Sequence, residues 1–371
     1  MTDTPVWDNG GWRALPALEG DVTADACVIG LGGSGLACVG ELLRLGCNVV
    51  GIDAIAVGGG AAGCNGGFLL AGISLFHHQA AERLGHDRAA AIYRLTLAEM
   101  DRMTAETPHS IRRVGSLRIA ADAAEFADCA VQVETMRADG LAAEQYSGPE
   151  GDGVLVPTDG VLQPLQRCRE LALRVAAAGA QLFERSAATA IESGVVRLAH
   201  GTIRAGTIIA AVDGRLDRVF PALAPRVRTA RLQMLATAPD DEVHYSRPVY
   251  RRWGYEYWQQ LADGRIALGG LRDKAGDAEW TASTAVTEPV QRGLDAVLRD
   301  ELKSNAAVTH RWAASVGYTD DRLPVIEEVR AGVWAIGGYS GTGNVVGAVC
   351  GRGVAQLAVR GDSTLIRELM R

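Results

Sequence analysis

The sequence lacks the features that mark membrane, secreted and metal-binding proteins. No apolar run approaches the roughly 20 residues of a membrane-spanning helix, and the first residues carry neither the basic nor the apolar part of a signal peptide. Seven cysteines are an odd number without paired spacing, which favours reduced thiols. His77-His78 has no second ligand pair at metal spacing. We therefore expect a cytoplasmic protein with no membrane span and no metal site.

A basic excess is also missing. The net charge is -7 and the isoelectric point is near 5.6, which argues against nucleic acid or an anionic membrane as a partner. With 371 residues, 48% of them hydrophobic, the chain is long enough for about two globular domains.

The most informative stretch is a glycine-rich turn between two short strands. Residues 27–29 form a short apolar run, residues 30–35 read Gly-x-Gly-x-x-Gly, helical spacing continues to Gly46, and a second strand over residues 49–52 ends at Asp53. This is the order of a dinucleotide-binding βαβ unit, with the helix N-terminus facing the phosphates. A glycine-rich surface loop is the alternative, but the flanking elements make it a poor explanation.

Each conspicuous residue of this unit has a physical role. Gly30 permits the tight turn, Gly32 leaves room for a pyrophosphate, and Gly35 lets helix and strand pack closely. Asp53 can accept hydrogen bonds from the ribose hydroxyls and would repel a 2′-phosphate. The ligand is therefore predicted to be FAD or NAD rather than NADP.

Two later segments are also expected at the ligand. Residues 57–67 are rich in small residues, and residues 338–344 form a second glycine-rich turn that opens the last helix, whose N-terminus favours negative charge. The strand over residues 207–212 ends in alanines, which suggests close approach. The predicted cofactor-binding residues are Gly30, Gly32, Gly33, Ser34, Gly35, Asp53, Ala54, Gly60, Ala61, Ala62, Asn65, Gly66, Gly67, Ala211, Gly338, Gly341, Thr342, Gly343 and Asn344.

Periodicity indicates the remaining elements. Helices are expected near residues 77–106, 125–140, 163–179 and 287–302, and from 345 onward, with strands near 114–120, 191, 196, 231–237, 265–270, 312–325 and 333–338. Residues 250–258 also read as a strand, with Arg251, Trp253, Tyr255 and Tyr257 on one face. That face suits a ligand pocket, an aromatic core or a dimer interface equally well.

In this set of segments the chain resembles the FAD-dependent oxidoreductases of the D-amino-acid oxidase and glycine oxidase type, closest to the γ-glutamylputrescine oxidase-like branch. Residues 60–67 match that branch's Gly-Ala-Ser-Gly-Arg-Asn-Gly-Gly, and the other matching segments are residues 28–53, 159–164, 319–324 and 338–343. The resemblance covers most of the chain. It implies FAD, and hydride transfer from the carbon beside a neutral amine to flavin N5, followed by imine hydrolysis and reoxidation by oxygen or another acceptor.

The resemblance also implies an α/β fold with an α+β second domain: a Rossmann-like FAD-binding domain carrying an inserted antiparallel-sheet substrate domain. We expect the FAD-binding domain over residues 1–75, 150–225 and 325–371, and the substrate domain over 76–149 and 226–324. Tyr255, Tyr257, Arg252 and Tyr339 are the predicted pocket residues, with a small amine or amino-acid derivative as substrate.

Three departures from the family bear on the substrate and the acceptor. Residues 314–318 lack the arginine that binds a substrate carboxylate in glycine and D-amino-acid oxidases, which disfavours a free α-amino acid unless Arg251, Arg252 or Arg322 substitutes. Ala267 stands where some relatives place an oxygen-activating lysine, so dehydrogenase activity stays open. Cys64 replaces the branch's arginine and could link a flavin covalently, although a plain substitution is the simpler explanation.

Two functions of other classes remain as alternatives. One is an FAD-binding subunit, or another dinucleotide-binding protein, without amine chemistry. The other is an NAD-dependent dehydrogenase, which would carry no visible colour.

Overall fold

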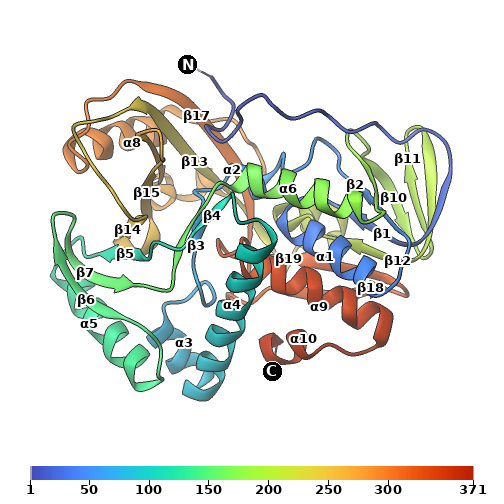
Figure 1. The fold of residues 1–371 in the computed structure, drawn as a ribbon, viewed down its shortest axis with the longest axis horizontal. Coiled ribbons are helices and arrows are strands. Elements are labelled where there is room, and N and C mark those ends of the chain that lie inside the picture. Colours follow the sequence, from blue (N-terminus) through green and yellow to red (C-terminus); the bar gives the residue numbers. More distant parts are fainter. Residues whose placement is uncertain (1, 371) are drawn as a thin grey trace.

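The computed structural model describes residues 2–370, whose strands form two large sheets and one small sheet (Figure 1). In the first sheet β1 is central and pairs in parallel with β2 and β12. In spatial order the strands are β10 (Ala188–Glu192), β11 (Val195–Leu198), β12 (Gly201–Ala210), β1 (Val22–Ile29), β2 (Val49–Ile52) and β9 (Gln181–Phe183), while β19 (Val333–Gly337) pairs with the end of β12 and β18 (Val325–Arg330) with β19.

Both faces of this sheet are buried. Ala26 and Val28 of β1 belong to one apolar cluster, whereas Cys27 and Ile29 belong to another, because successive strand side chains point to opposite faces. Three helices lie on the first face, as Figure 1 shows: α1 (Gly33–Arg44), α6 (Pro164–Ala177) and α9 (Val346–Arg360). The second face is covered by η1 (Asp213–Arg215), α7 (Leu216–Val219) and η2 (Pro221–Leu223).

The second large sheet is mostly antiparallel. Its only parallel pairing between described strands joins β14 to β5. In spatial order the strands are β17 (Val308–Tyr318), β13 (Arg228–Pro239), β16 (Arg265–Gly270), β15 (Glu256–Gln260), β14 (Val249–Arg251), β5 (Ser116–Ile119), β7 (Gly151–Val156) and β6 (Glu144–Gly148), with α8 (Glu288–Asp300) and α5 (Ala123–Ala138) packed beside them.

Shorter elements lie between the large sheets. They are α2 (Ala61–Cys64), the three-stranded sheet of β3 (Phe68–Leu69), β8 (Gly160–Leu162) and β4 (Ile111–Arg112), and the helices α3 (His77–Leu84) and α4 (His86–Glu106). The predicted helix over residues 77–106 is thus two helices. They separate at Gly85, whose φ of 87° no helix accommodates. The C-terminal α10 (Thr364–Met370) was not predicted.

The predicted fold class is confirmed: a mixed α/β domain is joined to a largely antiparallel second sheet. The domain boundaries remain a prediction, and strand pairing would move one of them, because β7 at residues 151–156 lies in the second sheet rather than the first. The N-terminal segment packs against the glycine-rich segment, since Trp7 is buried and its indole N–H donates to the Asn65 carbonyl at 2.9 Å. Within residues 2–370 no helix is long and apolar enough to cross a membrane.

The prediction of one continuous strand over residues 250–258 was wrong. β14 ends at Arg251, η3 (Arg252–Gly254) turns the chain, and β15 returns antiparallel to β14. Arg252 and Trp253 adopt φ of 51° and 52°, a left-handed conformation that an alternation of side chains does not reveal. The proposed common face of Arg251, Trp253, Tyr255 and Tyr257 therefore does not exist.

Candidate functional site

The glycine-rich turn at the end of β1 has no room for side chains at two of its positions. Gly30 has a φ of 100°, and a Cβ there would lie 2.5 Å from the Ala211 carbonyl oxygen. A Cβ on Gly35 would lie 1.8 Å from the Gly30 carbonyl oxygen, so α1 can approach β1 closely only with glycine. These contacts agree with the predicted roles of both residues, and they place Ala211 against the turn.

Asp53 at the tip of β2 fastens this turn. One carboxylate oxygen accepts the Leu31 N–H at 2.8 Å, and the other accepts the Ile55 N–H at 2.9 Å. Burial raises the pKa of Asp53, against the lowering effect of these two hydrogen bonds. Since each carboxylate oxygen has a second lone pair, a ribose contact stays a prediction, and Ala54 is exposed directly beside it.

The first turn of α1 offers N–H donors to a negatively charged group. Its N-cap is Gly32, no side chain caps it, and no acid lies in its first turn. Four unpaired N–H groups and the helix dipole therefore favour an anion there. Ser34 is buried beside this end of the helix.

Arg167 on α6 lies at the same place and was missed by sequence reasoning. A Cβ on Gly33 would lie 3.3 Å from its Nη1 atom. The residue is only 3% exposed, and its Nε and Nη2 atoms are buried without a hydrogen-bond partner. Burial lowers the pKa of the guanidinium. The carboxylates of Glu99 and Glu106 on α4 act on the Arg167 charge from a distance. Both of them form ion pairs with Arg352 and not with Arg167.

An isolated buried charge costs several kcal/mol. The combination of a buried guanidinium without a partner and a bare helix N-terminus therefore fits a ligand with its own negative charge, such as a pyrophosphate. The signal in the sequence was weak, because an arginine in an amphipathic helix normally faces water.

The glycine-rich segment over residues 57–67 is hydrogen-bonded to the turn over residues 338–344, which precedes α9. Asn65 and Asn344 exchange two hydrogen bonds of 3.1 and 3.0 Å, and Asn344 also donates to the Phe68 carbonyl at 2.9 Å. Asn65 donates further to the carbonyls of Ala61 and Ala62. Both amides are therefore used within the protein, so these two residues position the loops. The segment also approaches α1, because a Cβ on Gly32 would lie 3.0 Å from that of Ala62.

Asp213 fastens the turn that precedes α9. Its carboxylate accepts the N–H groups of Gly338 at 3.0 Å, Tyr339 at 3.2 Å and Gly317 at 3.2 Å. Burial raises the pKa of Asp213 to about 6, even though these hydrogen bonds lower it. The turn itself is tight, with φ of 67° at Gly338, 98° at Gly341 and 51° at Ser340.

Aromatic side chains of the second sheet border the glycine-rich segment. A Cβ on Gly66 would lie 3.1 Å from the Tyr257 ring, and the Phe68 ring meets Tyr257 edge-on with centroids 5.9 Å apart. Tyr250 packs edge-on to Phe68 at 6.4 Å. Burial raises the pKa of Tyr257, which therefore stays protonated at neutral pH. Phe68, Tyr250 and Tyr257 thus form an aromatic wall beside Gly66, and the Phe68 carbonyl accepts the Asn344 amide of the turn before α9.

The four predicted pocket residues are not brought together. Tyr257 lies in the aromatic wall and Tyr255 in the turn before β15. Arg252 is held by ion pairs to Glu256 at 3.1 Å and to Asp273. Tyr339 is 4% exposed and packs in the core between α1 and α9, where its ring contacts the Gly347 position. We therefore retain Tyr255 and Tyr257 as candidates and leave Arg252 and Tyr339 out of the pocket.

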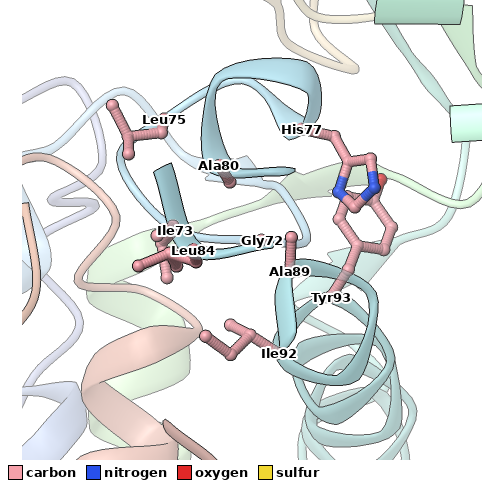
Figure 2. A pocket seen from close by; sticks show the side chains of 9 residues that line it. All are labelled: Gly72, Ile73, Leu75, His77, Ala80, Leu84, Ala89, Ile92 and Tyr93. Carbon is pink, nitrogen blue, oxygen red and sulfur yellow. The ribbon is translucent and has the colours of Figure 1, made fainter. Parts of the chain in front are cut away.

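Two cavities of the structure lie away from this site. Figure 2 shows an apolar cavity between α3 and α4, where the His77 and Tyr93 rings meet edge-on at 5.5 Å. Its volume of about 10 Å³ holds one water at most. A larger groove beside the Asp263-Gly264 turn contains none of the predicted site residues. Within residues 2–370 no three His, Cys, Asp or Glu side chains gather as a metal site would require.

A comparison with protein families decides the class of ligand. The sequence pattern of the DAO family, described as FAD dependent oxidoreductase, matches residues 25–357. The chain belongs to the DAO family. Its cofactor is accordingly FAD and its class is FAD-dependent oxidoreductase, which removes the NAD-dependent alternative.

Similar proteins place the chain within this DAO family. It is 29% identical to a probable oxidoreductase OrdL of Rhizobium meliloti, over 94% of this chain and 86% of that protein. It is 26% identical to gamma-glutamylputrescine oxidoreductase of Escherichia coli, over 95% and 87% of the two chains. The structure of glycine oxidase from Geobacillus kaustophilus superposes with a TM-score of 0.76 at 18% identity, covering 92% of this chain and 96% of that one. The last comparison supports the DAO fold alone.

Cys64 gives a prediction about how the DAO cofactor is attached. Its thiol lies 4.0 Å from the Gly59 carbonyl oxygen, and burial raises its pKa to about 12. Because the thiolate is the nucleophile, we expect no covalent flavin link. Acid precipitation should release all the flavin into the supernatant, and Cys64→Ala should keep the wild-type flavin content. Flavin retained by the precipitated wild type but lost by the variant would contradict this.

Proposed function

We propose that this chain oxidises the C–N bond of an amine or an amino-acid derivative. The observation that carries the proposal is the aromatic wall, which meets the glycine-rich segment beside the FAD cradle and offers no paired acid and base. Hydride transfer needs orientation and exclusion of water more than a catalytic dyad. The names of the similar proteins, which include a gamma-glutamylputrescine oxidoreductase, favour the same donor class.

The residues proposed to hold FAD form a continuous cradle. The first turn of α1 and Arg167 would neutralise the pyrophosphate, Asp53 would receive the ribose, and the turn held by Asp213 would face the flavin. When bound, FAD supplies the acceptor, at flavin N5, for the hydride that leaves the carbon beside the amine, and dioxygen or another acceptor then takes the electrons. The imine product is released and hydrolysed by water.

The protein's own part is to orient the substrate and keep the site dry. Phe68 and Tyr257 would exclude water from the reacting carbon, since their rings pack edge-on beside Gly66. The described part of the second sheet presents no lysine, with Ala267 buried on β16. Oxidase and dehydrogenase activity are therefore both compatible with the proposal.

An anaerobic absorbance titration tests this function. The purified protein should show flavin bands that bleach when one class of donor is added from a panel of amines and of D- and L-amino acids. Admission of air then separates an oxidase, whose bands return at once, from a dehydrogenase. Flavin bands that no donor bleaches would reject amine oxidation and favour the non-catalytic FAD-binding subunit.

A further inference from the structure

Two arginines beside the FAD cradle have aromatic neighbours but no acid. The guanidinium carbon of Arg272, at the start of η4 (Arg272–Glu279), lies 4.7 Å from the Tyr318 ring centroid, 4.8 Å from Trp280 and 5.7 Å from Tyr255. Arg322 lies 5.7 Å from the Tyr318 centroid. Tyr318 thus has two guanidinium groups close to its ring.

The neighbouring arginines differ in this respect. Arg251 pairs with Glu301 at 2.6 Å, Arg252 pairs with Glu256, and Arg228, which lies over the Trp280 ring at 4.0 Å, reaches Asp277 at 3.4 Å. Across residues 2–370, no ion pair or side-chain hydrogen bond involves the guanidinium of Arg272 or of Arg322. Aromatic faces stabilise a cation only partly, so these two half-buried charges keep the capacity to bind an anion.

The position of this pair is set by β17 and by strained backbone. The Tyr318 hydroxyl lies 3.7 Å from a Cβ position on Gly341, in the turn that precedes α9. Leu271, directly before Arg272, has a φ of 61°, and Arg322 itself has a φ of 63°. Non-glycine residues in this conformation cost of order 1 kcal/mol and tend to occur at binding sites. The two arginines thus come from separate loops to one ring at the border of the cradle.

We propose that Arg272 and Arg322 form an anion subsite that binds a carboxylate of the substrate. The inference rests on the proposed function and narrows its substrate class to amines that also carry a carboxylate. Guanidinium groups bind carboxylates through charge-assisted, often bidentate hydrogen bonds. A simple diamine would bring a second positive charge toward two unpaired cations and is disfavoured. Neither arginine lies in residues 314–318, where relatives carry the carboxylate-binding arginine, so this chain would meet the same need from two other loops.

The binding of benzoate and of benzamide to the FAD-loaded protein tests the subsite, because the two probes differ only in charge. Calorimetry and the perturbation of the flavin spectrum give Kd without turnover. Benzoate should bind the wild type at least about tenfold more tightly than benzamide, because the neutral amide carries no negative charge to pair with a guanidinium. Arg272→Met should weaken benzoate about tenfold and leave benzamide unchanged, and Arg272→Lys should restore part of the difference.

Two further variants complete the experiment. Arg322→Met should weaken benzoate in the same direction, whereas Arg228→Met, which removes the arginine already paired with Asp277, should not. Equal affinity for the two probes, or an effect of Arg228→Met as large as that of Arg272→Met, would overturn the proposal. Flavin content and circular dichroism identify a variant that fails to fold, in which case Arg322→Met decides. A protein that binds benzoate as expected while no amine bleaches its flavin would reject the proposed function and retain the subsite.

Discussion

Arg167→Met should weaken FAD binding about tenfold to a hundredfold and, at the same time, stabilise the protein without FAD. The first effect follows from the loss of charge-assisted hydrogen bonds to a phosphate, each contributing about 1.5–3 kcal/mol. The second follows because the variant removes a buried, unpartnered guanidinium, and replacing buried charge with an apolar side chain commonly stabilises by about 1–4 kcal/mol. Fluorescence titration of the apoprotein and urea unfolding measure the two effects.

The chain offers a matched control two residues away. Arg169 lies on the same helix but pairs with Asp8 at 2.9 Å, so Arg169→Met should leave FAD affinity unchanged. ADP and adenosine give a second comparison, because only ADP carries phosphates. Arg167→Met should weaken the binding of ADP and leave the binding of adenosine unchanged. Equal weakening of both ligands, or an apoprotein less stable than the wild type, would show that Arg167 has a structural role instead.

Asp159→Asn should change the pH dependence of the protein's stability. Burial raises the pKa of Asp159 from 3.8 to about 7, against the lowering effects of the Ser116 hydroxyl, the Ala71 N–H and Arg113. The carboxyl accepts the Ser116 hydroxyl at 2.7 Å and the Ala71 N–H at 3.2 Å. An asparagine can keep both contacts, because its oxygen accepts and its amide nitrogen donates.

The sign follows from proton binding. Between pH 3.8 and about 7 the folded state holds a proton on Asp159 that the unfolded state has released, so stability falls as the pH rises through this range. Asparagine cannot ionise, so the variant does not lose this stability as the pH rises. The variant should therefore gain on the wild type by about 3 kcal/mol between pH 5 and pH 8, at 1.36 kcal/mol per pKa unit. Urea unfolding at both pH values measures the gain.

Asp101→Asn is the control for this measurement. The Asp101 side chain is 76% exposed and pairs with Arg113, so the same change of pH should shift the stability of this variant relative to wild type very little. A constant difference between Asp159→Asn and wild type across the pH range would mean that Asp159 is ionised in the folded protein throughout.

Local sequence rules were sufficient where a residue's role depends on its near neighbours. The turn after β1 and the close packing of Gly35 were both predictable, because the backbone conformation at glycine is set by the contacts of one turn. The N-terminal half of β1 was not predicted. Its residues are only partly buried and are held in register by pairing with β12, which lies far away in the sequence.

The candidate site was only partly predictable, for a related reason. Nothing in the sequence around Arg167 or Arg272 marks either arginine as a ligand-binding residue. Only the folded chain shows that Arg167 has no acidic partner within residues 2–370, whereas Arg252 forms an ion pair with Asp273. The chain reverses at Arg252 and Trp253 because both residues adopt a left-handed backbone conformation, which arginine and tryptophan rarely do. The alternation of side chains contains no sign of this turn, and it therefore predicted one continuous strand. Whether a charged side chain finds an oppositely charged partner depends on residues far away in the sequence, which a short motif does not include.

The interleaved order of the first sheet has a consequence for how the protein is made. β1 pairs early with β2, but Val22 of β1 pairs with Ile203, and β12 in turn pairs with Val333–Ala335, so these two pairings form only late in synthesis. On the ribosome the first βαβ unit has one open edge until β12 emerges. α6 packs on α1 earlier, but α1 is fully covered only when α9 follows. Such non-local topology folds slowly and exposes apolar strands meanwhile. The cradle for the flavin should therefore be complete only after the turn at residues 338–344 has been made and has packed against the first βαβ unit.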